Sequence, residues 1–125
     1  MAAERAHDLE AERRRYRRAL ERAREEIPRR LAALPEVERV SLFGSFARGR
    51  RDLLTDLDLL VVMRTDLPFL ARLARLHALL ADLGVDLDIL CYTPEEFARM
   101  RTAPFLRRAL RDEVVLYAKE STGRG

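Results

Sequence analysis

The chain has 125 residues, of which 48% are hydrophobic and 36% are charged, a composition typical of one globular domain with a strongly ionic surface. Its net charge of +3 arises from acidic and basic residues interleaved along the sequence, so it gives no strong indication of a nucleic-acid surface. No apolar run approaches the ~20 residues of a membrane span, and the charged N-terminus lacks the pattern of a secretory signal, which predicts a cytoplasmic protein.

The first predicted element is a long amphipathic helix over about residues 8–34. Its apolar residues recur at spacings of three, four and seven and form one stripe: Leu9, Tyr16, Leu20, Ala23, Ile27, Leu31 and Leu34. Pro28 lacks an amide hydrogen and would clash with the carbonyl group four residues earlier. We therefore expect residues 1–35 to form an N-terminal helical segment that is kinked near residue 28 or broken near Glu26.

Strands and helices alternate after this segment. Patterns of alternation, helical spacing and capping predict these elements in order: a strand over 37–43, a short helix from Ser45, strands over 56–63 and 85–92 separated by a helix that ends at Gly84, two helices beginning after Thr93 and near Pro104, and a last strand over 113–118. This order predicts a single α/β (α+β) domain over residues 1–118, with a small mixed central sheet flanked by helices. Residues 119–125 are expected to be a flexible tail.

Two pairs of aspartates lie in predicted strands. Side chains alternate along a strand, so Asp56 and Asp58 share one face, as do Asp86 and Asp88. Two unit charges 4 Å apart repel by about 1 kcal/mol in water and about 4 kcal/mol at an effective dielectric of 20, so a cluster of such acids needs a cation. Arginine could supply that charge in a purely structural network. A set of oxygen ligands on a rigid sheet also suits magnesium, whose coordination is usually completed by substrate phosphates.

A glycine-serine turn precedes the first aspartate pair. Gly44 allows the backbone to approach a ligand closely, and the amide groups that open the following helix, with the Ser45 hydroxyl group, are suited to phosphate oxygens. The alternative is that the serine only caps the helix.

The combination of "GSFARG" with "TDLDLLVV" and a later strand acid resembles the minimal nucleotidyltransferases (MNT type) of the DNA polymerase beta nucleotidyltransferase superfamily. The similarity covers roughly residues 20–116 and implies a nucleotidyltransferase-like fold with the long N-terminal helix added. Thr55 and Phe46 depart from the commoner family residues without affecting the acids. The added domains that hold an acceptor in larger members are absent from this sequence, so acceptor recognition stays unassigned.

The resemblance also implies roles for individual residues. Asp56 and Asp58, with Asp88 as the third acid, would be catalytic and would bind two magnesium ions; Asp86 is the alternative third acid. The nucleotide would be bound by four further residues: Gly44, Ser45, Arg48 and Gly49.

The activity implied is transfer of a nucleoside monophosphate, AMP from ATP, onto a hydroxyl group of a partner protein. Small members resemble the antitoxin of HEPN/MNT toxin-antitoxin pairs, so an all-helical HEPN-type protein is the expected partner. A homo-oligomer or a heteromeric complex is expected, because so small a fold offers few walls for a second substrate. The alternatives are a non-catalytic module that binds nucleotide or neutralises a partner, and a small-molecule adenylyltransferase of the aminoglycoside type.

Overall fold

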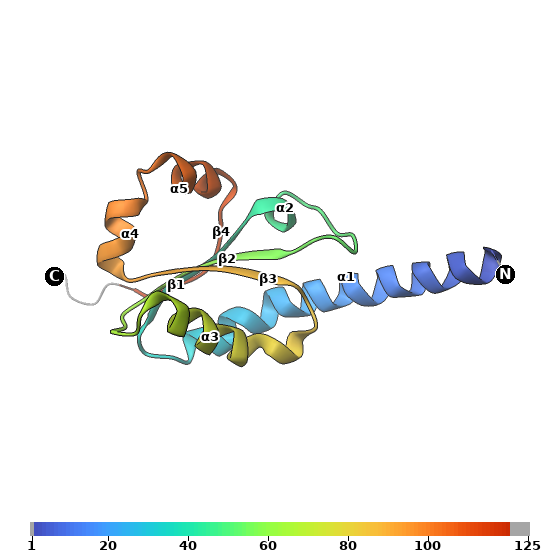
Figure 1. Ribbon diagram of the computed structural model, residues 1–125, viewed down its shortest axis with the longest axis horizontal. Helices are drawn as coiled ribbons and strands as arrows, with labels where there is room; N and C mark the ends of the chain where they lie inside the picture. Colours follow the sequence, from blue (N-terminus) through green and yellow to red (C-terminus); the bar gives the residue numbers. More distant parts are fainter. Residues whose placement is uncertain (1, 121–125) are drawn as a thin grey trace.

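The computed structural model describes residues 2–120, which form one four-stranded sheet with helices on both faces (Figure 1). The strand order is β3-β2-β1-β4; β1 is antiparallel to both of its neighbours, whereas β2 and β3 are parallel. The elements are α1 (Ala2–Ala32), β1 (Val37–Phe43), α2 (Gly44–Ala47), β2 (Leu57–Met63), α3 (Phe69–Leu80), η1 (Ala81–Leu83), β3 (Leu87–Tyr92), α4 (Pro94–Met100), α5 (Pro104–Ala109), η2 (Leu110–Asp112) and β4 (Val114–Ala118). The predicted mixed sheet with flanking helices and a long N-terminal helix is confirmed.

Helix α1 packs against one face of the sheet through part of its predicted apolar stripe. Four residues of the stripe are fully buried: Leu20, Ala23, Ile27 and Leu31. Leu9 is 44% exposed, because the N-terminal part of α1 extends past the end of the sheet (Figure 1). The helix is continuous through Pro28, so a break near Glu26 is a wrong prediction. Burial of Ile27 and Leu31 on either side, each worth about 1.5–3 kcal/mol, offsets the roughly 3 kcal/mol cost of an internal proline.

Alternation along the strands creates two apolar layers. In β2, Leu57, Leu59 and Val61 belong to the larger layer, which is packed with residues of α1 and α3. Leu60 and Val62 point to the opposite face and pack with residues of α4 and α5. Asp58 lies two residues before Leu60 in the same strand, so its side chain lies on the same face of the sheet, the one covered by α4 and α5.

The helix ends follow the local signals in the sequence. Gly84 has a positive φ of 71° directly after η1, as expected for the residue that terminates a helix. Before α4, Thr93 accepts a hydrogen bond from the Glu96 amide while the Glu96 side chain accepts one from the Thr93 amide. This capping box confirms that a helix begins after Thr93, and it fixes where the chain turns after β3.

The end of the chain is only partly described. The amide of Lys119 donates to the Glu38 carbonyl oxygen at 2.8 Å, so this residue is attached to β1. The prediction that the flexible tail begins at residue 119 is therefore wrong for Lys119. The remainder of the predicted tail, residues 121–125, lies outside the described residues. No helix in the described part of the chain has both the length and the apolar character needed to cross a membrane.

Candidate functional site

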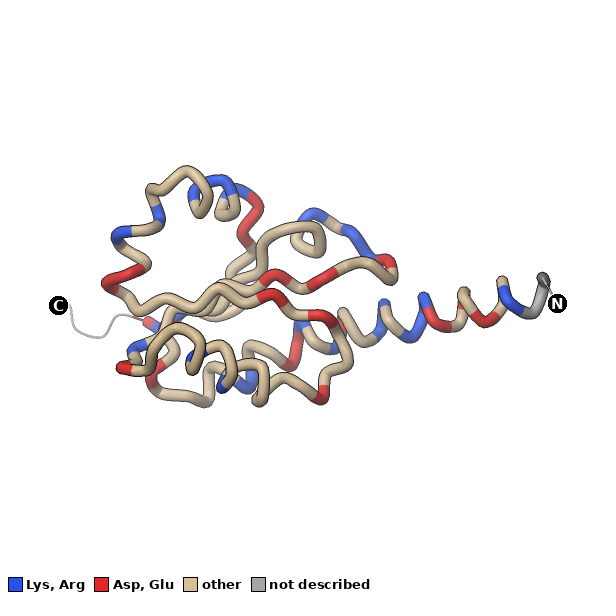
Figure 2. Tube along the Cα trace, in the orientation of Figure 1, with Lys and Arg blue, Asp and Glu red and all other residues tan. Residues whose placement is uncertain are grey.

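The four strand aspartates lie at one end of two adjacent strands. Asp56 and Asp86 immediately precede β2 and β3, and Asp58 and Asp88 are the second residues of those strands. The two strands are parallel, and Asp58 pairs directly with Asp88 in their register. The acidic positions of β2 and β3 therefore form one patch at this edge of the sheet (Figure 2). The two aspartate pairs thus lie on neighbouring strands, as a single cluster of acids requires.

Asp58 is a half-buried carboxylate with a raised pKa. Burial, followed by the negative charges of Asp88 and Asp56, raises its pKa to about 6, and the positive charge of Arg48 offsets this only in part. Asp88 pairs directly with Asp58 in the strand register and its charge acts on Asp58, so the geometry favours Asp88 over Asp86 as the third member of the cluster.

The described basic side chains form no ion pair with the cluster, although the charge of Arg48 acts on Asp58. Within the residues that the structure describes, Asp56, Asp58 and Asp88 form no ion pair with arginine, lysine or histidine. In the same part of the chain, no three His, Cys, Asp or Glu side chains are already gathered as a set of metal ligands. The acids thus form a patch of like charge rather than a preformed coordination shell, and a bound cation would relieve their repulsion.

Gly44 connects the glycine-serine turn to this cluster. A Cβ atom added at Gly44 would lie 2.0 Å from Oδ2 of Asp58, and the glycine has a positive φ of 75°. Phe43, the residue before it, pairs directly with Asp58 across β1 and β2. Only glycine fits here, because any side chain would both strain the backbone and overlap the carboxylate. The turn and the acids therefore form one site.

The structure also places the other predicted nucleotide-binding residues. Ser45 is the second residue of α2, and the N-cap is Phe43, so the alternative in which this serine caps the helix is wrong. Arg48 follows α2 and pairs with Asp112 at 3.3 Å. Gly49 has a φ of 107° in the turn beyond it, where an added Cβ atom would meet nothing within 4 Å. Nucleotide binding by these residues stays a prediction.

Tyr16 is a residue of the site that the sequence did not reveal. Its hydroxyl group donates a hydrogen bond to the Thr55 carbonyl oxygen at 2.7 Å and accepts one from the Asp86 amide at 3.2 Å. It thereby ties α1 to the segments that lead into β2 and β3, directly before the acids. Burial raises the pKa of this hydroxyl group, so it stays protonated and able to donate. The helical pattern could predict only that Tyr16 lies on the packed face of α1.

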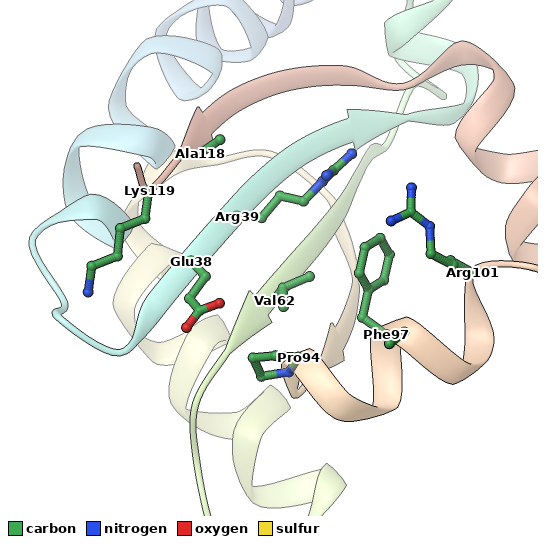
Figure 3. Close-up of a pocket in the computed structure, with 9 residues that line it drawn as sticks. Glu38, Arg39, Val62, Pro94, Phe97, Arg101, Ala118 and Lys119 are labelled. Carbon is green, nitrogen blue, oxygen red and sulfur yellow. The ribbon is translucent and has the colours of Figure 1, made fainter. Parts of the chain in front are cut away.

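A separate cavity of ≈400 Å³ lies at the opposite edge of the sheet, between the strands and α4 (Figure 3). Its basic residues already have partners: Arg39 binds Glu113 through two nitrogens, and Lys119 donates to the Pro35 carbonyl oxygen. Arg39 and Arg101 also lie beside the Phe97 ring, 5.4 and 5.2 Å from its centre. This cavity shares no residue with the acid patch and is not the candidate site.

Comparison with known proteins gives one family. The model of the nucleotidyltransferase domain matches residues 20–117, a span that contains the glycine-serine turn and every strand aspartate. No curated protein matches the chain at a significant level.

Several solved structures share the fold. A candidate minimal nucleotidyltransferase is 33% identical, with a TM-score of 0.56 over 78% of this chain and 93% of that one. A chain of a toxin-antitoxin crystal structure with AMP-PNP is 22% identical, with a TM-score of 0.53 over 76% of this chain and 70% of the other. A chain from the complex of tri-AMPylated Shewanella oneidensis HEPN toxin with MNT antitoxin is 20% identical, with a TM-score of 0.52 over 79% and 72%.

Proposed function

Because this chain belongs to the nucleotidyltransferase domain family, we propose that it transfers AMP from ATP to a hydroxyl group of a partner protein. One observation carries the proposal: Asp58 pairs with Asp88 across two parallel strands while its carboxylate lies directly against Gly44. This arrangement sets acids suited to a divalent cation beside a backbone turn suited to phosphates, as metal-assisted phosphoryl chemistry requires.

Asp56, Asp58 and Asp88 fit a magnesium site by their chemistry. They offer only oxygen ligands and form no ion pair with a basic residue among the described residues, and burial together with the charges of Asp88 and Asp56 raises the pKa of Asp58. We propose that they hold two magnesium ions, which would supply charge neutralisation at the phosphates and a lowered pKa for the acceptor hydroxyl group.

The other residues would bind and orient the donor nucleotide. Gly44 leaves room for phosphate oxygens next to the backbone, and the Ser45 hydroxyl group, free of a capping role, can donate to them. Arg48 adds a positive charge on the same side. The acceptor oxygen would bond to the α-phosphorus as the bond to pyrophosphate breaks, and the acceptor proton would leave toward the carboxylates around Asp88. Arg48 also pairs with Asp112, at 3.3 Å.

The proposed acceptor is a small all-helical HEPN-type protein, which would make this chain the antitoxin of a toxin-antitoxin pair. Likeness of fold to chains from such complexes supports this choice. An external acceptor also agrees with the structure, because the described chain is a single sheet with short helices around the acid patch.

The test is incubation of the purified chain and a HEPN-type partner with magnesium and ATP, GTP, CTP or UTP in turn, followed by mass spectrometry of the partner. We expect a mass increase of one or more AMP groups with ATP alone, and no increase with the double variant Asp56→Asn, Asp58→Asn. The control is Asp66→Asn, which removes an exposed carboxylate away from the site. If the unmodified chain adds no nucleotide to the partner and the double variant still neutralises that partner in cells, the protein acts by binding and the proposed activity is wrong.

A further inference from the structure

A cavity of ≈510 Å³ lies between α2 and α5, beside the acid patch. Its lining comes from the end of β1, from α2 and from the α5–η2 segment: Phe43, Gly44, Arg48, Phe105, Arg108, Ala109, Arg111 and Asp112. Phe43 pairs directly with Asp58, and directly paired residues of antiparallel strands project to the same face of a sheet. The cavity and the Asp58 carboxylate are therefore on the same face, at the same edge.

The cavity has a surplus of positive charge. Arg48, Arg108 and Arg111 line it, and Asp112 is its only acidic residue. Asp112 pairs with Arg48, while within the described residues Arg108 and Arg111 form no ion pair. Three guanidinium groups around one cavity repel one another unless an anion lies between them, and their planar forks suit phosphate oxygens.

Helix α2 is short, so the helix itself provides little positive charge for an anionic ligand, and the arginine side chains of the cavity would provide it instead. The helix has only four residues, Gly44–Ala47, so few peptide dipoles add up at its N-terminus. Its N-cap residue, Phe43, offers no polar side chain. A triphosphate carries several negative charges; magnesium at the acids would neutralise part of this charge, and the short helix with Arg48 adds little on the side away from the metal.

Phe105 adds an aromatic surface to the same cavity. Its side chain is 65% exposed, which is unusual for a phenylalanine on a helix whose neighbour Leu106 is fully packed. An exposed ring beside several arginines is a combination that binds nucleotides, because the ring can stack on a base while the cations hold phosphates.

We propose that α5 and η2 form the second wall of the donor-nucleotide site. Arg108 and Arg111 bind the phosphates from the side opposite the Gly44 turn, and Phe105 stacks on the base. This inference rests on the proposed function, and it assigns donor binding to three residues outside the glycine-serine and aspartate motifs.

The test is calorimetric titration of the full chain with two probes, ATP with magnesium and inorganic tripolyphosphate with magnesium. For the double variant Arg108→Gln, Arg111→Gln we expect both dissociation constants to rise, by about tenfold for each arginine, as loss of a charge-assisted hydrogen bond implies. Phe105→Leu should weaken ATP binding and leave tripolyphosphate binding unchanged. The matched control is Arg107→Gln, which lies on the same helix outside the cavity lining and should bind both probes like the unmodified chain.

The outcomes separate this inference from the proposed function. Suppose that the unmodified chain binds ATP and modifies its partner, and that the double variant binds both probes as tightly as the unmodified chain. The proposal that α5 and η2 bind the donor nucleotide is then wrong, and the proposed activity stands. If tripolyphosphate binding depends on Arg108 and Arg111 but no nucleotide is transferred to the partner, the assignment of phosphate binding to these arginines stands and the proposed activity is wrong. Should the double variant fail to fold, Arg108→Lys and Arg111→Lys keep the charge and should show smaller losses of affinity; unchanged affinity in both would overturn the inference. An unmodified chain that binds neither probe would overturn it as well.

Discussion

Replacement of Asp58 by asparagine should make the metal-free protein more stable at neutral pH. A carboxyl group titrates near pH 3.8 when unperturbed, whereas burial and the neighbouring acids raise the pKa of Asp58 to about 6. Between these pH values the folded state binds more protons than the unfolded state, so the free energy of unfolding falls as pH rises through that window. Above pH 6 the ionised Asp58 destabilises the fold by its full amount, and asparagine removes that charge with little change in volume.

The magnitude follows from the shift in the pKa of Asp58. A shift from 3.8 to about 6 corresponds to about 3 kcal/mol if none of it is screened. The carboxylate is only partly buried, and solvent screening lowers the expected gain to about 1–2 kcal/mol. For a domain of this size such a gain would raise the melting temperature by about 3–8 °C.

The assay is thermal and urea unfolding of both proteins in a chelator at pH 8 and pH 4. We expect the gain of Asp58→Asn at pH 8 and almost none at pH 4, where the unmodified side chain is already largely protonated. Asp66→Asn, a change of one exposed carboxylate, should show no such pH-dependent difference. Equal stability of Asp58→Asn and the unmodified chain at pH 8, or a gain of the same size at both pH values, would show that burial and the neighbouring acids do not disfavour the ionised form of Asp58.

Three further substitutions, the first with a matched glycine control, test other parts of the site and its support. Gly44→Ala should destabilise the fold and abolish nucleotide transfer, because the new methyl group would overlap Asp58. Gly84 has a similar positive φ but open space around an added methyl group, so Gly84→Ala should cost only the backbone strain of about 1–2 kcal/mol. Equal losses of stability for the two variants in urea unfolding would contradict a clash with Asp58. Tyr16→Phe should lower the free energy of unfolding by about 1–3 kcal/mol and weaken magnesium binding, measured by calorimetry, because two hydrogen bonds behind the acids are lost. Thr93→Ala should cost about 1 kcal/mol in urea unfolding with nucleotide transfer unchanged, because it removes only the cap of α4; a loss of transfer would place α4 in the site.

Local patterns in the sequence predicted most of the helices and strands, and they predicted two parts of the candidate site: the first aspartate pair and the glycine-serine turn. Alternation along a strand predicts that Asp56 and Asp58 share one face, because it depends only on neighbouring residues, although β2 itself begins at Leu57. The glycine-serine turn was likewise visible from the end of one strand. The start of α2 was predicted one residue late, at Ser45 instead of Gly44, since the sequence does not show that Phe43 takes the cap position.

The positions of Asp88 and Tyr16 relative to the other acids depend on pairing between segments that are distant in the sequence. The sequence left Asp86 and Asp88 as alternatives, and only the register of β2 against β3 brings Asp88 next to Asp58. Tyr16 reaches segments 39 and 70 residues away, so no local spacing could have assigned it to the site.

The composition, the amphipathic periods and the two short motifs determined what kinds of elements the chain forms and which side chains can do chemistry, because these properties depend on residues close in sequence. Which of those side chains meet, how α1 continues through Pro28, and where α5 closes a cavity against α2 were decided by the tertiary structure. The physical reason is that burial and strand register join residues far apart in the chain, and their free energies exceed the local preferences that a sequence displays.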